Sequence, residues 1–268
     1  MSAELMERLK SLGPWFHRID LPGGTTTPGN DWDYLWNNTK SAIRGLSYQG
    51  KRVLDIGSMD GFWAFEAERR GASYVVSSDI NAACADRLLF CREALGSKVV
   101  PFFNVHVEHL QESENFLGRF DIIQHLGVLY HLPDPFVSLT QCRALLDEGG
   151  HLVLETIAIL GIPMSCMVFN GVMPSDHGSG YWWRLYKGAH PQWAPTLSCL
   201  LEMLLLAGFI PQLETLSQVA QPPSHGINAD DPGVTYGRTR VALVARAANR
   251  EEITTEVIAS VLASARQG

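Results

Sequence analysis

Carboxylates and glycines are interleaved over residues 55–61, which read DIGSMDG. Glycine lets the backbone turn tightly and lets a ligand approach the main chain. A dinucleotide-binding turn has the pattern GxGxxG, with a pyrophosphate at the helix N-terminus. This turn lacks the third glycine, and Asp55 and Asp60 would repel a pyrophosphate. They suit a ligand with a positive amino group, such as the methionine end of S-adenosylmethionine, with Gly57 and Ser58 as further contacts.

A third carboxylate, Asp79, follows the next apolar run, about 20 residues on, where an acidic residue would meet ribose hydroxyls. For Gly57 alone, an ordinary strand-to-helix turn with a capping glycine explains the residue equally well. The combination with Asp79 favours a nucleoside cofactor site over that reading.

The sulfur of S-adenosylmethionine is a positively charged sulfonium that activates its methyl group. Transfer of that methyl group requires alignment of the reacting groups and exclusion of water. A base is needed only if the acceptor must lose a proton during attack. His125, just past an apolar run, is the best placed candidate by position, and Tyr130 follows closely. His177 is an alternative base on the substrate side, although such a loop residue more often lies in a solvated turn.

These residues need a sheet to position them. Apolar runs predict strands that alternate with helical patterns, which indicates an α/β fold with a doubly wound, Rossmann-like, mostly parallel seven-stranded sheet. In such a sheet the ligand lies beyond the carboxyl ends of the strands. The expected strands are 52–57, 74–78, 99–103, 120–124, 151–156, 209–216 and 239–245, the last being the antiparallel edge strand. The expected helices are 3–12, 31–45, 62–70, 81–95, 135–146, 197–207 and 251–266.

The alternation predicts four regions. Residues 1–50 form N-terminal lid helices, 51–160 the cofactor-binding core, 161–195 an aromatic-rich insertion after the fifth strand, and 196–268 the rest of the core with a terminal helix. The insertion is expected to cap the cleft and to bind an aromatic or apolar acceptor. Its candidate contacts are Tyr181, Trp182 and Trp183, although core packing explains any one of them about as well.

Trp32 and Trp36 lie one helical turn apart in the lid region. Two tryptophans at this spacing usually cover a core. The functional alternative is a lid, with Trp32 against the cofactor and Trp36 against the substrate, because a cofactor cation is attracted by aromatic faces.

The composition bounds the function. The chain has 268 residues and a net charge of −7, so whole-protein binding of a polyanion is disfavoured, though a local patch is not excluded. Five scattered cysteines without a C-x-x-C pair predict no metal site and favour reduced thiols in a cytoplasmic protein. The apolar stretch 197–206 is too short to cross a bilayer, so no membrane association is expected. The oligomeric state is left open.

By its motifs the chain resembles class I S-adenosylmethionine-dependent methyltransferases, and most closely the branch with the tRNA wobble-uridine carboxymethyltransferases. The resemblance covers roughly residues 14 to 245. Its motifs are Pro14-Trp15, Asp31-Trp32, LDIG at 54–57, GVLYH at 127–131, GHLVLET at 150–156, and a late Thr-x-x-Arg at 235–238.

The resemblance implies S-adenosyl-L-methionine as cofactor, and it implies the contacts residue by residue. These are Trp32, Gly57, Asp79, Ile80, Asn81, Val107, Glu108, Leu126, Tyr130 and Arg238. The carboxymethyl-transferring enzymes carry two lysines that would complement the donor's extra carboxylate, and here the nearest positions hold His17 and Asn37. A buried carboxylate without a partner is costly. We therefore expect the plain methyl donor, with His17 on the substrate side.

Two functions stay open on the sequence. The first is a methyltransferase acting on a small aromatic or apolar metabolite, and the second is a tRNA wobble-uridine carboxymethyl- or methyltransferase. A non-catalytic cofactor-binding module is a third, weaker possibility.

Overall fold

The computed structural model describes the chain except for residues 1–2, 170–172, 175–188, 191–192, 221–237 and 266–268. The strands are β1 Asp20–Leu21, β2 Thr25–Thr26, β3 Arg52–Ile56, β4 Tyr74–Asp79, β5 Val100–Phe103, β6 Phe120–Leu126, β7 Leu146–Ile159, β8 Met167–Phe169, β9 Met173–Pro174, β10 Ala189–His190, β11 Trp193–Pro195, β12 Phe209–Ala220 and β13 Arg238–Ala247. The helices are α1 Ala3–Ser11, α2 Asp33–Ala42, α3 Phe62–Arg69, α4 Ala85–Leu95, α5 Glu114–Leu117, α6 Pro135–Leu145, α8 Leu197–Leu206 and α10 Thr255–Ala265. Short 3-10 helices are η1 Ala82–Cys84, η2 Val107–Ser113, η3 Leu129–His131 and η4 Arg250–Glu252.

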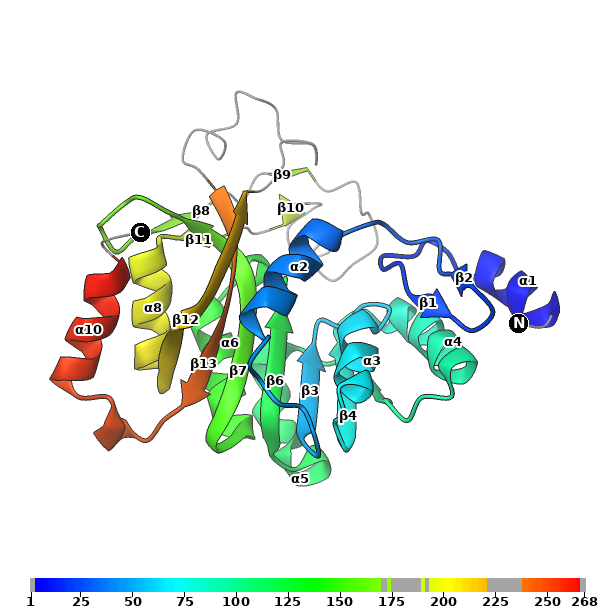
Figure 1. Cartoon of the computed structure of the whole chain (residues 1–268), viewed down its shortest axis with the longest axis horizontal. Helices are drawn as coiled ribbons and strands as arrows, with labels where there is room; N and C mark the ends of the chain where they lie inside the picture. The colour runs from blue at the N-terminus through cyan, green and yellow to red at the C-terminus, as the bar shows by residue number, and fades with distance from the viewer. Residues whose placement is uncertain (1–2, 170–172, 175–188, 191–192, 221–237, 266–268) are drawn as a thin grey trace.

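Seven strands form one central sheet in the order β12-β13-β7-β6-β3-β4-β5 (Figure 1). The neighbours from β7 through β6, β3 and β4 to β5 pair in parallel, whereas β13 pairs antiparallel with both β7 and β12. This confirms the predicted α/β fold with a mostly parallel seven-stranded sheet. The prediction that residues 239–245 form the edge strand is wrong, because β12 lies outside β13.

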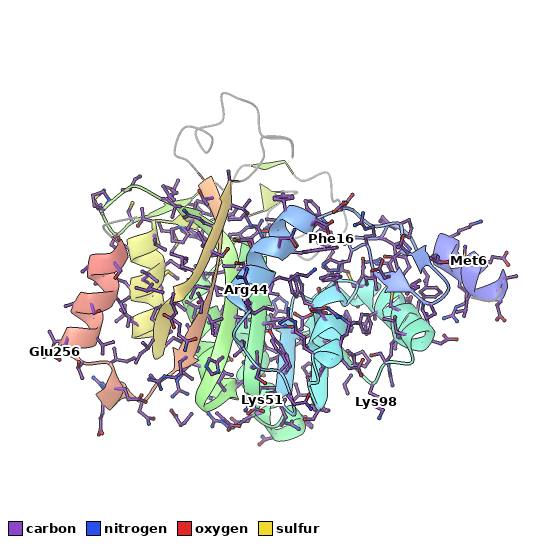
Figure 2. The ribbon with its side chains drawn as sticks, viewed as in Figure 1. Met6, Phe16, Arg44, Lys51, Lys98 and Glu256 are labelled. Carbon is purple, nitrogen blue, oxygen red and sulfur yellow. The ribbon has the colours of Figure 1, made fainter. Side chains whose placement is uncertain are left out.

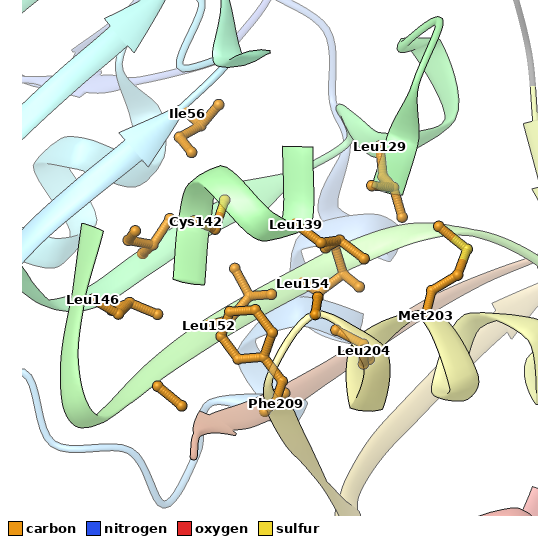
Figure 3. Close-up of a cluster of buried hydrophobic side chains, with 14 of the residues drawn as sticks. Ile56, Leu129, Leu139, Cys142, Leu146, Leu152, Leu154, Met203, Leu204 and Phe209 are labelled. Atoms are coloured by element: carbon orange, nitrogen blue, oxygen red, sulfur yellow. The ribbon is translucent and has the colours of Figure 1, made fainter. Parts of the chain in front are cut away.

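Helices cover both faces of the sheet. One buried cluster joins the strands to α6 and α8 and includes Leu139, Leu154, Leu204 and Phe209 (Figure 3). A second cluster joins the other face to α1, α2, α3 and α4. The buried strands are therefore apolar on both faces, which is why they read as continuous apolar runs in the sequence.

The strand β7 begins earlier than predicted. Helix α6 ends at Leu145 and β7 starts at the next residue, so Gly149 and Gly150 lie inside the strand rather than at the end of the helix. The register between β6 and β7 shifts between Phe120 and Ile122. A β-bulge of this kind accommodates extra residues in one strand, and glycine is common there.

The N-terminal region lies along the same side as α3 and α4 (Figure 1). Its loop contains the β1–β2 pair, which the proline- and glycine-rich sequence of residues 15–29 did not reveal. In the insertion, β8 pairs with β11 and β9 pairs with β10. Among the helices of the described residues, none has the length and apolar character to span a bilayer.

Candidate active site

The glycine turn after β3 has the tight geometry that its sequence predicts. Gly57 adopts φ 68°, and a Cβ there would lie 2.3 Å from Cγ2 of Val128. Met59 adopts φ 49°, a left-handed conformation that is uncommon for a residue with a side chain. Ser58 is buried, with its hydroxyl 2.6 Å from that of Ser77. The turn thus presents main chain, rather than side chains, at the carboxyl end of β3.

Asp79 lies at the end of β4 and is held by main-chain groups on both sides. Its Oδ2 accepts a hydrogen bond from the N–H of Met59 at 2.8 Å, and its Oδ1 accepts one from Asn81 at 2.7 Å. Burial raises the pKa of Asp79 above its ordinary value. Because a carboxylate oxygen can accept two hydrogen bonds, each oxygen retains capacity for a ligand hydroxyl.

Asp55 lies within β3 on the same face as Asp79, two residues out of register on the neighbouring strand. It is buried, and its Oδ2 has no hydrogen-bond partner among the residues that the structure describes. Burial, and then the Asp79 carboxylate, raise the pKa of Asp55 well above its ordinary value. A buried carboxyl oxygen without a partner is unfavourable, and a bound ligand donor would satisfy it.

Asp60 is not placed to bind a ligand, which corrects the sequence prediction. Its side chain is fully buried, and Oδ2 accepts hydrogen bonds from the N–H groups of Phe16 and His17 at 2.5 and 2.9 Å. Its Oδ1 accepts from Nε of Arg87 at 2.5 Å. The chain itself supplies the cation and the donors that the sequence assigned to a cofactor.

A polar cluster lies where β6, β7 and β13 meet beside α2. Arg240 on β13 donates to both carboxylate oxygens of Glu155 on β7, at 2.6 and 2.5 Å, and to the hydroxyl of Tyr130 at 3.1 Å. Arg240 and Glu155 are both buried. Burial raises the pKa of Tyr34 on α2, and the charges of Arg240 and Glu155 also act on this hydroxyl. Burial raises the pKa of Tyr130, which makes it a poor general base.

Gly127 ties this cluster to the glycine turn through its neighbour Val128. A Cβ at Gly127 would lie 3.6 Å from Arg240, 3.8 Å from Glu155 and 3.8 Å from the Tyr130 hydroxyl. From the sequence, Glu155 was expected only as one of the residues around the cleft at the strand ends, without a role of its own, and Arg240 was not named. The available signal was one acid, Glu155, in the expected strand 151–156 and one arginine, Arg240, in the expected strand 239–245. Charges within buried strands are found almost only in pairs.

The remaining cofactor candidates follow the carboxyl ends of the neighbouring strands. Ile80 and Asn81 follow β4, Val107 and Glu108 begin η2, and Leu126 ends β6. All but Val107 are partly exposed, and Val107 is buried. The fold therefore brings these five residues to the edge that already carries Gly57 and Asp79, and their contact with a cofactor stays a prediction.

The aromatic residues of the lid region form one stack. Trp36 is buried and stacked on Phe62, with centroids 4.0 Å apart and planes at 15°. Trp32 is partly exposed, stacks on Phe16 at 5.6 Å, and donates from Nε1 to the Phe16 carbonyl. His17 is buried beside this stack, and burial lowers its pKa to about 4. Packing thus accounts for Trp36 and His17, whereas Trp32 is only partly buried and its contact with a cofactor stays a prediction.

His125 is not at the open edge, which corrects its prediction as a base. It lies within β6, is fully buried, and its Nε2 is 2.6 Å from the hydroxyl of Ser138 on α6. Burial lowers its pKa to about 4, so the ring is neutral at pH 7. The side chain points into the core between the sheet and α6, where an acceptor has no access.

Four candidates lie outside the described residues: His177, Tyr181, Trp182 and Trp183. Arg238 begins β13, opposite Ile159, but its side chain also lies outside the described part of the structure. Arg240, two residues further along the same strand, is the arginine that the structure places in the polar cluster.

The chain matches a family model described as "Methyltransferase domain" over residues 33–209. Two curated relatives are both named tRNA U34 carboxymethyltransferase. That of Actinobacillus pleuropneumoniae serotype 3 is 28% identical over 77% of this chain and 59% of its own length. That of Pseudomonas putida is 31% identical over 77% of this chain and 60% of its own length. The chain thus spans about three fifths of these relatives.

A solved structure has a similar fold. The N-terminal domain of EvdMO1 with SAH bound superposes with a TM-score of 0.65, at 20% identity, over 92% of this chain and 98% of that domain. This likeness supports the Rossmann-like architecture described above.

Proposed function

The chain belongs to the methyltransferase domain family, and on this premise we propose that it transfers a methyl group from S-adenosylmethionine to a small-molecule acceptor. The observation that carries the proposal is the pair of buried carboxylates at the glycine turn. Within the described part of the chain, Asp55 has an oxygen without a partner, and Asp79 has acceptor capacity left at the end of the adjacent strand. An amino group and two ribose hydroxyls of such a cofactor supply the donors that this pair lacks.

The residues at this edge fit that cofactor. Gly57 leaves the main chain accessible, and a larger residue there would meet Val128. Asp79 would bind the ribose, Asp55 the ammonium group, and Trp32 would cover an exposed face of the ligand. S-adenosylmethionine supplies a methyl group activated by a positively charged sulfur.

The residues of the chain position the donor and the acceptor and exclude water, since methyl transfer from such a donor depends mainly on alignment. The Glu155–Arg240–Tyr130 cluster lies beside the glycine turn and presents a balanced pair of charges with a phenol hydroxyl. Neither the buried His125 nor Tyr130, whose pKa is raised, is suited to remove a proton at neutral pH. Of the candidate bases that the structure describes, neither is therefore suited to this role, and the proposal takes the acceptor to be already nucleophilic.

A plain methyl donor fits better than a carboxylated one. Of the two positions where the resemblance implies a donor-binding lysine, His17 is buried and neutral at pH 7, and Asn37 carries no charge. Arg240, the cation of the polar cluster, has its charge compensated by Glu155. These three positions, all within the described part of the chain, therefore offer no uncompensated cation to an additional carboxylate, and burial of a carboxylate without a counter-ion is unfavourable.

The names of the curated relatives favour a second candidate, modification of the wobble uridine of tRNA. Against it stands the net charge of −7, because binding of a polyanion relies on lysine and arginine contacts with phosphates. A small-molecule acceptor agrees better with this charge.

Calorimetric titration with S-adenosylhomocysteine tests the cofactor, and we expect a dissociation constant in the micromolar range, roughly −8 kcal/mol. Absence of binding would overturn both functions together. Titration of the protein with bulk tRNA at low and moderate salt separates them. Tight binding with a steep salt dependence would replace the small-molecule acceptor with tRNA.

A further inference from the structure

The fully buried carboxylate of Asp60 joins two segments that are far apart in the sequence. One oxygen binds the N–H groups of Phe16 and His17, and the other binds Nε of Arg87 on α4. We call residues 14–18 the N-terminal strap. Phe16, in the strap, lies close to α2 (Figure 2). Asp60 therefore attaches the strap directly to the glycine turn.

The residue before Asp60 faces the cofactor side. The N–H of Met59 donates to Asp79, the carboxylate that we assign to the ribose. Gly57, Met59 and Gly61 all have positive φ angles, of 68°, 49° and 93°. The N–H of Gly61 donates to the carbonyl of Ser58 at 2.8 Å and closes the turn around the consecutive residues Met59 and Asp60, so a change in the position of Met59 is passed on to Asp60.

The strap in turn supports an aromatic residue of the candidate site. The carbonyl oxygen of Phe16 accepts a hydrogen bond from Nε1 of Trp32 at 3.3 Å, and the two rings stack. The imidazole of His17 packs against Phe62, the first residue of α3, with the ring centroids 5.8 Å apart. A strap released from Asp60 would therefore leave Trp32 without this support.

We propose that Asp60 is a positioning residue that couples the N-terminal strap to the cofactor turn. Through Asp60, ligand contact with Asp79 and the Met59 main chain orders the strap, and the ordered strap holds Trp32 against the ligand. The proposal rests on the proposed function, because it takes the cofactor to bind at Asp79. It assigns to Asp60 a role at this site without contact to the cofactor.

Hydrogen exchange of the wild-type protein tests the coupling without any mutation. The peptide covering the strap is compared with and without saturating S-adenosylhomocysteine. We expect the Phe16 and His17 amides to exchange at least about tenfold more slowly with the ligand, which is within the usual range of coupling between sites. If the ligand binds and the exchange of the strap is unchanged, the coupling is refuted.

The variant Asp60→Asn tests the residue. An amide accepts hydrogen bonds more weakly than a carboxylate and cannot pair with the Arg87 charge. We expect faster tryptic cleavage after Arg18 even without ligand, and an affinity for S-adenosylhomocysteine reduced by about tenfold. A lower melting temperature with unchanged affinity and unchanged cleavage would show that Asp60 is only structural and would overturn the proposal.

Glu66→Gln is the matched control. Glu66 is also a buried carboxylate, on α3, and it pairs with Arg69 and Arg70 rather than with the strap. This variant should lose stability while keeping both the affinity and the cleavage rate of the wild type. If Glu66→Gln reproduces the effects of Asp60→Asn, general loss of stability explains them and the proposal fails.

The tests separate this inference from the proposed function. Faster cleavage of unliganded Asp60→Asn reports attachment of the strap, whatever the protein binds. If wild-type protein binds no S-adenosylhomocysteine while Asp60→Asn still releases the strap, the function is wrong and the attachment stands, without the coupling.

Discussion

Arg240 and Glu155 form a buried, two-pronged ion pair between β13 and β7, with N–O distances of 2.6 and 2.5 Å. Both side chains are largely withdrawn from solvent, at 9% and 5% exposure. The pair joins the last parallel strand to the antiparallel strand beside it, and it holds the Tyr130 hydroxyl as well. It is therefore both a part of the candidate site and a link within the sheet.

Removing one member of this pair should destabilise the fold strongly. Arg240→Met leaves Glu155 buried without a counter-ion, so we expect a loss of about 3–5 kcal/mol in the free energy of unfolding. The double variant with Glu155→Leu removes both charges and should regain most of that loss. Urea denaturation of the three proteins measures this, and a double variant no more stable than Arg240→Met would contradict the account.

Replacing Asp79 should weaken cofactor binding more than it affects the fold. Asp79→Ala removes the acceptor that we propose for two ribose hydroxyls. We expect a loss of about 2 kcal/mol, which corresponds to roughly thirtyfold lower affinity for S-adenosylhomocysteine. Asp86→Ala, an exposed acid on α4, is the control. Calorimetric titration of both variants gives the affinities. Equal binding by Asp79→Ala and the wild type would remove Asp79 from the site.

Acidification should destabilise the protein partly through His125. Its pKa in the folded state is about 4, below its ordinary value of 6.5. The unfolded chain therefore binds the proton first, and stability falls as the pH drops from about 6.5 towards 4. At pH 5 this effect amounts to about 2 kcal/mol.

The variant His125→Gln isolates that effect. His17 has a similarly lowered pKa and contributes with the same sign in both proteins, whereas the raised pKa of Asp55 acts in the opposite direction. Denaturation at pH 7 and pH 5 should show a smaller stability loss in the variant, by about 2 kcal/mol. Identical losses in the two proteins would mean that His125 is not buried as a neutral ring.

The close approach of Gly57 and Val128 predicts a coupled pair of substitutions. Gly57→Ala places a methyl group 2.3 Å from Cγ2 of Val128, at a φ of 68°. We expect a loss of about 2–4 kcal/mol from the unfavourable backbone and the steric conflict together. In a Val128→Ala background the same change should cause a loss of only about 1–2 kcal/mol, the backbone part alone. Equal losses in both backgrounds, measured by denaturation, would exclude the steric conflict.

The sequence identified the strands well because parallel strands that are buried on both faces appear as apolar runs, as in residues 52–56 and 74–79. It also placed Asp79 and Gly57 correctly at the carboxyl edge, since this follows from strand order alone. The position of β13 inside the sheet was not predictable, because an apolar run such as residues 241–245 is compatible with an edge or an interior place.

Side-chain partners were harder to predict than positions. Asp60 has the same residue type and spacing as a ligand-binding acid, but its cation is Arg87, which only the packing of α4 brings near. His125 was predicted to lie just past an apolar run, whereas β6 continues to Leu126 and directs the imidazole towards α6. The strand was predicted to end at residue 124, and because it continues for two more residues His125 lies inside the sheet, where the alternation of side chains places it on the face towards α6.

The order of the strands has a consequence for synthesis. Arg240 emerges from the ribosome 85 residues after Glu155, a delay on the order of ten seconds at usual translation rates. During that interval the five parallel strands have all been synthesised, but Glu155 on β7, the last of them, does not yet have its counter-ion. The polar cluster can thus form only late in the synthesis of the polypeptide, and a product terminated before β13 would lack Arg240 and leave Glu155 without its counter-ion.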